Sequence, residues 1–136
     1  MKVVPDTILW VSYCTRPEGY RHRIIERAFR ERVRLFVSSY ILEELTSVLT
    51  EDLGCSRRFA FLARRAVLRI AKLVNLPPDI PHHVPSDSQD DAIVQTALSA
   101  GADYLVTADN QLLRLGKVES VAIIQTAQFE HLLSMG

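Results

Sequence analysis

The sequence predicts an α/β protein with a central, mostly parallel β-sheet that helices cover on both faces. Short apolar strands alternate with helical patterns along the chain, which is typical of a parallel sheet. The length of 136 residues suits one domain. The composition, 48% hydrophobic and 24% charged residues, is that of a soluble globular protein. We therefore expect residues 1–136 to form a single domain.

The first half of the chain provides two strands and three helical patterns. In order, we expect a strand over 2–5, a helix over 21–31, a strand over 33–37, a helix from 38 or 39 to about 53, and a helix over 56–75. Pro5 suits a strand end because proline lacks the N–H that a strand interior needs. Ser38 or Ser39 can cap the second helix, and Gly54 stops it. Pro77 and Pro78 break the third pattern.

The second half opens on a proline-containing loop over residues 79–87. We then expect a helix from 88 to about 100, a strand over 103–107, a short helix after 109, a strand over 121–124 and a final helix from 126. Ser88 with Asp91 resembles a capping box, and Gly101 ends the helix that follows. Asp109 can cap the short helix.

Charge is unevenly distributed although the formal net charge is zero. Residues 1–78 carry 14 Lys/Arg and 8 Asp/Glu, a balance of +6, and residues 79–136 carry 2 and 8, a balance of −6. A basic half can attract a polyanion by releasing its counterions, and an acidic half can hold divalent cations. Two solvated faces of different charge would produce the same pattern. Basic stripes at helical spacing are Arg23, Arg27, Arg30 and Arg34, and Arg57, Arg58, Arg64, Arg65, Arg69 and Lys72.

No segment suggests a membrane or a secreted protein. No apolar run approaches the ~18 residues of a membrane span, and the N-terminus lacks the pattern of a signal peptide. Cys14 and Cys55 match no metal-ligand spacing, so we expect free thiols in a reducing cytoplasm.

Two carboxylates follow strands of the predicted sheet. Asp6 ends the first strand, and Asp109 lies just past Thr107 at the end of a later one. In an open α/β sheet, ligands bind outside the carboxyl ends of the strands. Both acids are therefore expected at one sheet edge.

Helix phase selects two further acids. With a step of about 100° per residue, Glu44 falls on the border of the apolar face of its helix and Glu43 on the opposite side. On the later helix, Asp90 points along the centre of the apolar face and Asp91 lies about a quarter-turn away. A carboxylate that faces the core is costly unless it is paired or binds a cation. We therefore select Glu44 and Asp90.

Each of the four acids also has a structural explanation. Asp6 can be a turn residue, Asp90 and Asp109 can be helix caps, and Glu44 can be a solvated helix acid. Four such positions at one sheet edge favour a site instead. Oxygen-only ligands suit Mg²⁺ or Mn²⁺, and such ions activate water and orient phosphodiesters. The chain has no GxxxxGK[ST], GxGxxG or GxSxG motif.

Four segments, in their order and spacing, resemble the PIN-domain family, and in particular the VapC-type toxins of prokaryotes. They are Asp6-Thr7 after a strand, the run from Ser38 to Leu45, the run from Asp87 to Ala97, and the run from Gly101 to Asp109. The Ala-Asp-Tyr-Leu-Val-Thr-x-Asp stretch in the last run is the most specific. The resemblance spans nearly the whole chain.

The resemblance implies an α/β/α sandwich and a metal-dependent ribonuclease that hydrolyses RNA phosphodiester bonds. The family's four acidic positions map onto Asp6, Glu44, Asp90 and Asp109, which would hold Mg²⁺ or Mn²⁺, and Thr107 matches a hydroxyl position that often lines the site. Thr7, Asp87 and Asp91 are auxiliary candidates. The implied partners are an RNA substrate, a cognate antitoxin protein and a second copy of the chain, in the cytoplasm and without a membrane.

Two positions depart from the family pattern. Ile8 stands where the family usually has Asn, which removes a polar contact, and Pro5 replaces an apolar residue before the first Asp. The Ile8 departure keeps an alternative open, namely a catalytically weak or inactive PIN-like module that binds RNA or protein. A different Mg²⁺-dependent phosphotransfer domain is a third reading. The chain lacks the second Asp after Asp6 that a phosphatase of the haloacid-dehalogenase type needs, and the paired acids of a receiver domain.

Overall fold

A six-stranded sheet forms the centre of the computed structural model, which describes residues 1–81, 83–84 and 88–136, with the backbone alone for residues 88 and 89. The strand order is β3-β2-β1-β4-β6-β5, and all neighbours are parallel except β5 and β6. The strands are β1 (Lys2–Pro5), β2 (Arg34–Ser38), β3 (Ala71–Val74), β4 (Tyr104–Val106), β5 (Lys117–Val118) and β6 (Val121–Ile124). The predicted α/β class with a mostly parallel sheet is confirmed.

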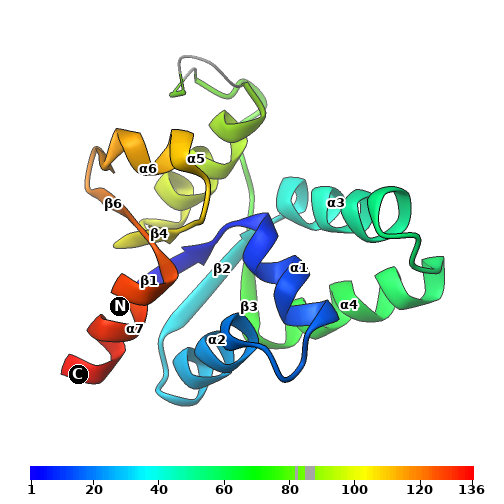
Figure 1. Ribbon diagram of the computed structural model, residues 1–136. Helices are drawn as coiled ribbons and strands as arrows, with labels where there is room; N and C mark the ends of the chain where they lie inside the picture. The colour runs from blue at the N-terminus through cyan, green and yellow to red at the C-terminus, as the bar shows by residue number, and fades with distance from the viewer. Residues whose placement is uncertain (82, 85–87) are drawn as a thin grey trace.

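Helices cover both faces of this sheet. They are α1 (Thr7–Thr15), α2 (Tyr20–Arg30), α3 (Ser39–Ser47) with its π-helical continuation η1 (Val48–Asp52), α4 (Arg57–Ile70), α5 (Ser88–Ala100), α6 (Asn110–Leu115) and α7 (Thr126–Met135). α1 packs against α2, α3 and α4, and α2 packs against α7, whereas α5 lies across β1, β2, β3 and β4. Right-handed crossovers place α5 and α6 on the face opposite α1 to α4. The result is a three-layer α/β/α arrangement (Figure 1).

The chain changes direction across the sheet between β1 and β4. From β1 it proceeds to β2 and β3 on one side, and it then crosses to β4 and β6 on the other. The register pairs Pro5 with Val106 at the carboxyl ends of the two strands. Both strands are buried, and Val3, Val4, Leu105 and Val106 are at most 1% exposed. This junction is the topological switch point, where open α/β sheets bind their ligands.

Three elements differ from the sequence-based expectation. α1 was not predicted because its apolar residues surround the helix, with Leu9, Trp10, Val11 and Tyr13 all buried, so no amphipathic period marks it. The helix expected over 56–75 ends at Ile70, and residues 71–74 pair with β2 as an edge strand. The short β5 adds an antiparallel edge. The remaining strands and helices lie within a few residues of their predicted bounds.

Three further predictions concern the cysteines, membrane-spanning helices and the residues at the start of α5. Cys14 and Cys55 are free thiols. Within the described residues, no helix is long and apolar enough to cross a membrane. The capping box expected at Ser88 involves a side chain outside the described residues, and Asp87, an auxiliary candidate, also lies outside them.

Ser38 connects β2, α3 and α5 beneath the carboxyl edge of the sheet. Its hydroxyl is fully buried, accepts a hydrogen bond from the Ile41 N–H (3.3 Å) as the N-cap of α3, and shares a second one with the Thr96 hydroxyl of α5 (2.8 Å). Ser56 caps α4 in the same way, by accepting from the Phe59 N–H (3.0 Å), but on the surface. The two serines therefore allow a buried helix cap to be compared with an exposed one.

Ser38→Ala should lower the free energy of unfolding by about 2–3 kcal/mol, because it removes a cap and leaves buried polar groups with fewer partners. Ser56→Ala should lower it by about 1 kcal/mol, the loss of an exposed cap. Urea unfolding followed by circular dichroism measures both. Equal losses would show that the Ser38–Thr96 contact adds no stability.

Candidate active site

Asp6 is the buried carboxylate at the switch point. It directly follows β1 and is the N-cap of α1, and one of its oxygens, Oδ1, accepts a hydrogen bond from the Thr7 N–H (2.6 Å). Its other oxygen, Oδ2, accepts from the Thr107 hydroxyl (2.7 Å). The Asp6 N–H donates to the Val106 carbonyl (2.9 Å), which extends the β1–β4 ladder by one residue. The strand register therefore brings Thr107 against Asp6.

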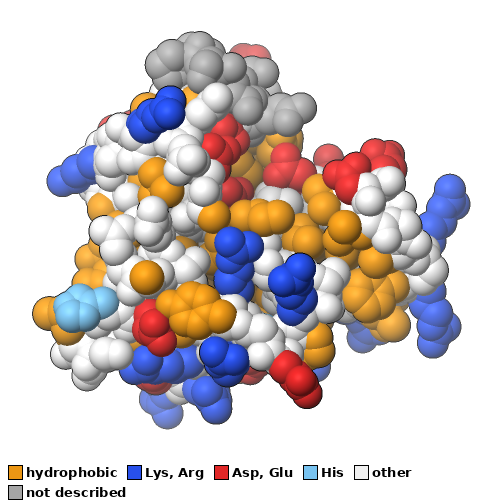
Figure 2. Space-filling view, viewed as in Figure 1, with side chains coloured by type: hydrophobic (Ala, Val, Ile, Leu, Met, Phe, Trp, Pro, Cys, Tyr) orange, Lys and Arg blue, Asp and Glu red, His pale blue; other side chains and the backbone are white. Residues whose placement is uncertain are grey.

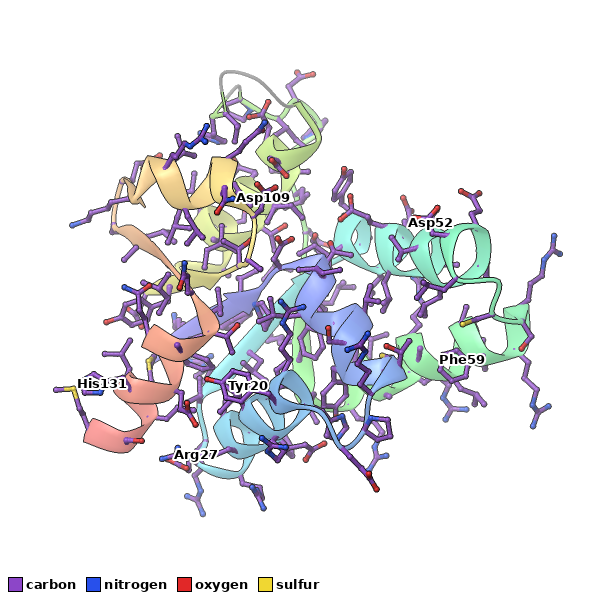
Figure 3. All side chains as sticks on the ribbon, in the orientation of Figure 1. Tyr20, Arg27, Asp52, Phe59, Asp109 and His131 are labelled. Atoms are coloured by element: carbon purple, nitrogen blue, oxygen red, sulfur yellow. The ribbon has the colours of Figure 1, made fainter. Side chains whose placement is uncertain are left out.

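Asp109 lies beyond the end of β4 (Figure 3), close enough to Asp6 for its charge to act on that carboxyl. Its N–H donates to the Thr107 hydroxyl oxygen (3.0 Å), and its Oδ1 accepts from the Gln111 N–H (2.8 Å) as the N-cap of α6. Thr107 is fully buried and bonds to both acids. One hydroxyl thus sets the relative position of the two carboxylates.

Glu44 and Asp90 arrive from helices on the two faces of the sheet. Glu44 lies in the second turn of α3, and the Tyr40 hydroxyl lies 3.5 Å from its Oε2. It is half-buried, whereas Glu43 is exposed, as the helix phase predicted. Asp90, in the first turn of α5, is also half-buried.

The expectation that Asp90 is the more buried of its pair was wrong. Asp91 is only 5% exposed, and its Oδ1 accepts hydrogen bonds from the His83 and Val84 N–H groups (2.6 Å each). Asp91 therefore anchors the backbone that precedes α5. The helix phase was measured against apolar residues alone and missed this short-range backbone contact. Asp90, and not Asp91, lines the same hollow as the other three acids.

All four selected acids line one hollow of about 420 Å³. It opens where Figure 2 shows acidic side chains above the position of α1, with hydrophobic ones between them. No Lys or Arg of the described residues lines it. The lining residues are Asp6, Thr7, Ile8, Val11, Glu44, Val48, Asp90, Ala108 and Asp109. Thr107 lies behind Asp6 and supports the hollow without lining it.

Sequence reasoning missed the apolar walls of this hollow. Val11 and Val48 belong to the unpredicted α1 and to the π-helical turn η1, and Ala108 lies in the loop before Asp109. The spacing of Thr7, Ile8 and Val11 would have indicated one helical face if α1 had been recognised.

The electrostatics of the hollow disfavour a full set of bare negative charges. Burial raises the pKa of Asp6 above its usual 3.8, and the nearby Glu44 and Asp109 charges raise it further, against the lowering effect of the Thr107 and Thr7 hydrogen bonds. Carboxylates that repel one another in this way suit a hard cation. Thr7 adds a buried hydroxyl oxygen that has no hydrogen-bond partner within the described part of the chain.

The side-chain oxygens of the hollow fit an ion that keeps part of its water shell better than an ion coordinated by protein ligands alone. No three Asp, Glu, His or Cys side chains of the described residues lie close enough together to chelate one ion as they stand. Mg²⁺ usually keeps several waters and binds through one or two carboxylates together with substrate phosphates. The residues present therefore fit a water-rich Mg²⁺ or Mn²⁺ site.

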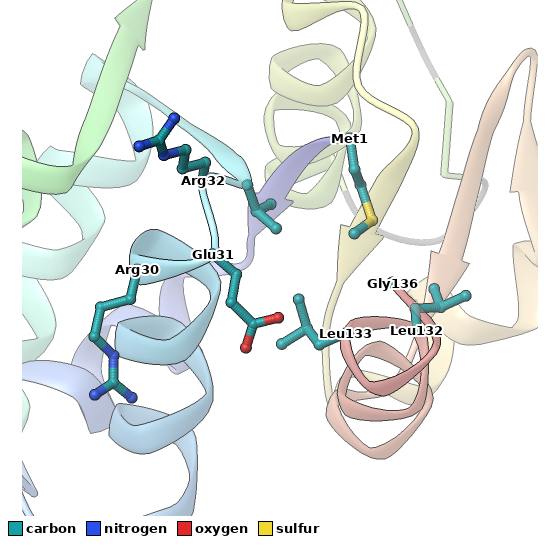
Figure 4. Close-up of a pocket in the computed structure, with 8 residues that line it drawn as sticks. Met1, Arg30, Glu31, Arg32, Leu132, Leu133 and Gly136 are labelled. Carbon is teal, nitrogen blue, oxygen red and sulfur yellow. The ribbon is translucent and has the colours of Figure 1, made fainter.

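A second hollow, of about 500 Å³, lies at the opposite edge of the sheet between α2 and α7 (Figure 4). Glu31 is its one acidic side chain among the described residues, and it pairs with Arg27. Arg30 and Arg32 stand at its rim. This hollow lacks the converging carboxylates of the first, which makes the first the candidate active site.

Comparisons with known proteins agree with this architecture. A family model described as PIN domain matches residues 2–111. No curated protein sequence matches the chain significantly. The fold is similar to three solved structures, each below 20% sequence identity.

The first is VapBC2 from Rickettsia felis bound to a DNA fragment from its promoter, with 12% identity, TM-score 0.69, and 92% of this chain and 98% of that chain covered. The second is Mycobacterium tuberculosis VapC20, a sarcin-ricin loop cleaving toxin, with 18% identity, TM-score 0.62, and 86% and 97% covered. The third is PAE2754 from Pyrobaculum aerophilum, with 18% identity, TM-score 0.69, and 100% and 91% covered. At these identities the likeness concerns the fold.

The raised pKa of Asp6 predicts a specific pH dependence of stability in EDTA. Because the folded state holds the Asp6 proton more tightly than the unfolded state, this group stabilises the fold below pH 3.8 and loses that contribution as the pH rises through its folded pKa. Asp6→Asn lacks the ionisation but keeps an oxygen that can cap α1. The wild-type protein should therefore lose stability relative to Asp6→Asn as the pH rises toward neutrality. Urea unfolding at a series of pH values measures the difference, and a pH-independent difference would contradict the prediction.

Proposed function

The chain belongs to the PIN domain family, and from this premise we propose that it is a metal-dependent ribonuclease whose residues 1–136 form one nuclease domain. One observation carries the proposal. Four carboxylates from four separate segments of the chain line a single hollow at the switch point of the sheet, and no Lys or Arg of the described residues lines it with them. A site of this kind suits a phosphodiester substrate only together with a divalent cation.

The proposed roles follow from where the side chains stand. Asp6, Glu44, Asp90 and Asp109 hold Mg²⁺ or Mn²⁺ and the waters around it, and Thr7 adds a neutral oxygen. A cation held there supplies an activated water and neutralises charge on the leaving oxygen. Thr107 is a positioning residue, because its hydroxyl orients Asp6 and receives the Asp109 N–H.

RNA is the substrate that we propose, and toxicity is the biological role. Two of the structural relatives support this choice, since one is a toxin that cleaves the sarcin-ricin loop and the other is a VapBC complex. By the same likeness, the chain would work in the cytoplasm as a homodimer that a cognate antitoxin protein holds inactive.

Ile8 favours a second candidate function. This side chain is 42% exposed and lines the hollow at a position where the family usually carries Asn. An apolar group there gives no hydrogen bond to a bound water or phosphate. The alternative is a PIN-like module that binds RNA or protein and cleaves slowly or not at all.

Cleavage assays on matched acid variants separate the two candidates. Asp6→Asn and Glu44→Gln should each reduce Mg²⁺- or Mn²⁺-dependent RNA cleavage by at least about 100-fold, since even groups that only support metal ligands are worth 10- to 100-fold. Glu43→Gln, one residue away and solvent-exposed, should cleave as the wild type does. EDTA should abolish all cleavage. Activity that survives EDTA or Asp6→Asn would refute the proposal, and RNA binding without products would support the binding module.

The toxin role predicts an effect on growth. Expression of the wild-type chain should slow bacterial growth, and co-expression of the protein encoded by an adjacent small reading frame should restore it. Asp6→Asn, expressed at the same level, should be harmless because the chemistry is lost. Equal toxicity of Asp6→Asn and the wild type would separate growth arrest from cleavage.

A further inference from the structure

A basic hollow adjoins the acidic one along α1. It has a volume of about 270 Å³ and is lined by Ser12, Arg16, Gly19, Tyr20, Arg21 and His22. Ser12 lies four residues beyond Ile8 on α1, and Arg16 lies four residues further, at its C-cap. Residues four apart share a helix face. One face of α1 therefore leads from the acidic hollow, which Ile8 lines, to the basic one.

The two arginines of this hollow are available to an anion. Neither Arg16 nor Arg21 forms an ion pair with any described residue. Arg16 is exposed, and Arg21 is half-buried. Figure 2 shows Lys and Arg side chains over α1, below the acidic side chains around the acidic hollow, with hydrophobic side chains between the two groups.

Hydrogen bonds and stacking hold the wall of the basic hollow in place. Arg21 Nη1 donates to the Ser12 hydroxyl (3.1 Å), which ties the guanidinium to α1. His22 Nδ1 donates to the Tyr13 carbonyl (2.7 Å), and its ring stacks on Tyr13 at 4.3 Å between centroids. The Tyr13 hydroxyl in turn donates to Glu26. An arginine fixed in this way loses less conformational freedom when it binds a phosphate.

We propose that Arg16 and Arg21 hold a backbone phosphate of the RNA strand whose reactive phosphodiester lies at the acidic hollow, an inference that rests on the proposed function. Eight residues of helix separate Ile8 from Arg16, about 12 Å along the axis. That distance corresponds to roughly three to four stacked nucleotides at about 3.4 Å each. Guanidinium groups pair with phosphate through two parallel hydrogen bonds.

The negative charge of the acidic hollow explains why an RNA strand would need the basic hollow beside it. Four acids repel a polyanion, and no Lys or Arg among the described residues lines their hollow. Two other pairs of arginines lie elsewhere, since Arg57 and Arg64 line a groove between α3 and α4, and Arg30 and Arg32 lie at the opposite sheet edge. Arg16, at the C-cap of α1, and Arg21, bonded to Ser12 of α1, are thus two cations that lie along the same helix as Ile8 of the acidic hollow.

Binding and cleavage by Arg16→Gln/Arg21→Gln test the proposal. With an oligouridylate long enough to span both hollows, the variant should bind on the order of ten-fold more weakly, and the slope of log K against log salt should fall by about 0.7, the value for one phosphate of a single strand. For cleavage, KM should rise by a similar factor with kcat unchanged. A dinucleotide, which is too short to reach Arg16, should behave alike with both proteins.

Two further variants make the result specific. Arg30→Gln/Arg32→Gln removes the same charge at the opposite edge of the sheet and should bind as the wild type does (Figure 4). Arg16→Lys/Arg21→Lys keeps the charge and should recover most of the affinity. Should the double glutamine variant fail to fold, Arg16→Gln alone, at an exposed site, serves in its place.

Several outcomes would overturn the proposal: wild-type affinity and salt slope in the glutamine variant, an equal loss in the control variant, an equal loss with the dinucleotide, or no oligouridylate binding by the wild type. Failure of the proposed function looks different. If the wild type binds the long RNA but never cleaves it, the nuclease assignment falls, and the binding and salt data still decide whether Arg16 and Arg21 hold a phosphate.

Discussion

The pairing of β1 with β4 is the interaction on which the rest of the site depends. It places the Thr107 hydroxyl 2.7 Å from an Asp6 carboxylate oxygen, and the same hydroxyl accepts a hydrogen bond from the Asp109 N–H two residues further along the chain. A buried carboxylate is costly without partners, and here a hydroxyl, a backbone N–H and the start of α1 offset that cost only in part, as the raised pKa of Asp6 indicates. The remaining cost favours a cation beside Asp6.

The formal net charge is zero because a basic first half and an acidic second half of the chain cancel. The acidic second half of the chain supplies Asp90 and Asp109, but the site is complete only because the basic first half contributes Asp6 and Glu44. The same first half supplies Arg16 and Arg21, next to the acids along α1. A polyanion that spans both hollows meets repulsion at one and attraction at the other. A divalent cation in the acidic hollow would therefore offset part of that repulsion in addition to activating water.

The sequence predicted the edge where the acids meet because that inference needs only connectivity: each parallel strand ends at the same edge, whatever the packing. Helix phase also predicted correctly that Glu44 lies at the border of the buried face of its helix and Glu43 in solvent. Sequence-based prediction failed where tertiary contacts overrode local pattern. α1 carries no amphipathic period because it is buried nearly all round, residues 71–74 leave the helix to pair with β2, and Asp91 is buried through two backbone N–H groups that no periodicity reveals. The basic hollow was missed for the same reason, since one of its walls belongs to α1.

The same two carboxylates, Asp6 and Asp109, can serve both as helix caps and in the proposed chemistry. Asp6 and Asp109 each use Oδ1 to accept a backbone N–H at a helix start, and each also lines the acidic hollow. A cap fixes the direction of a carboxylate that would otherwise rotate, so the structural role prepares the chemical one. It also explains why amide variants are informative here, since asparagine can keep the cap while removing the charge. The contribution of the cap to the fold and the contribution of the charge to the site are then separable at the same residue.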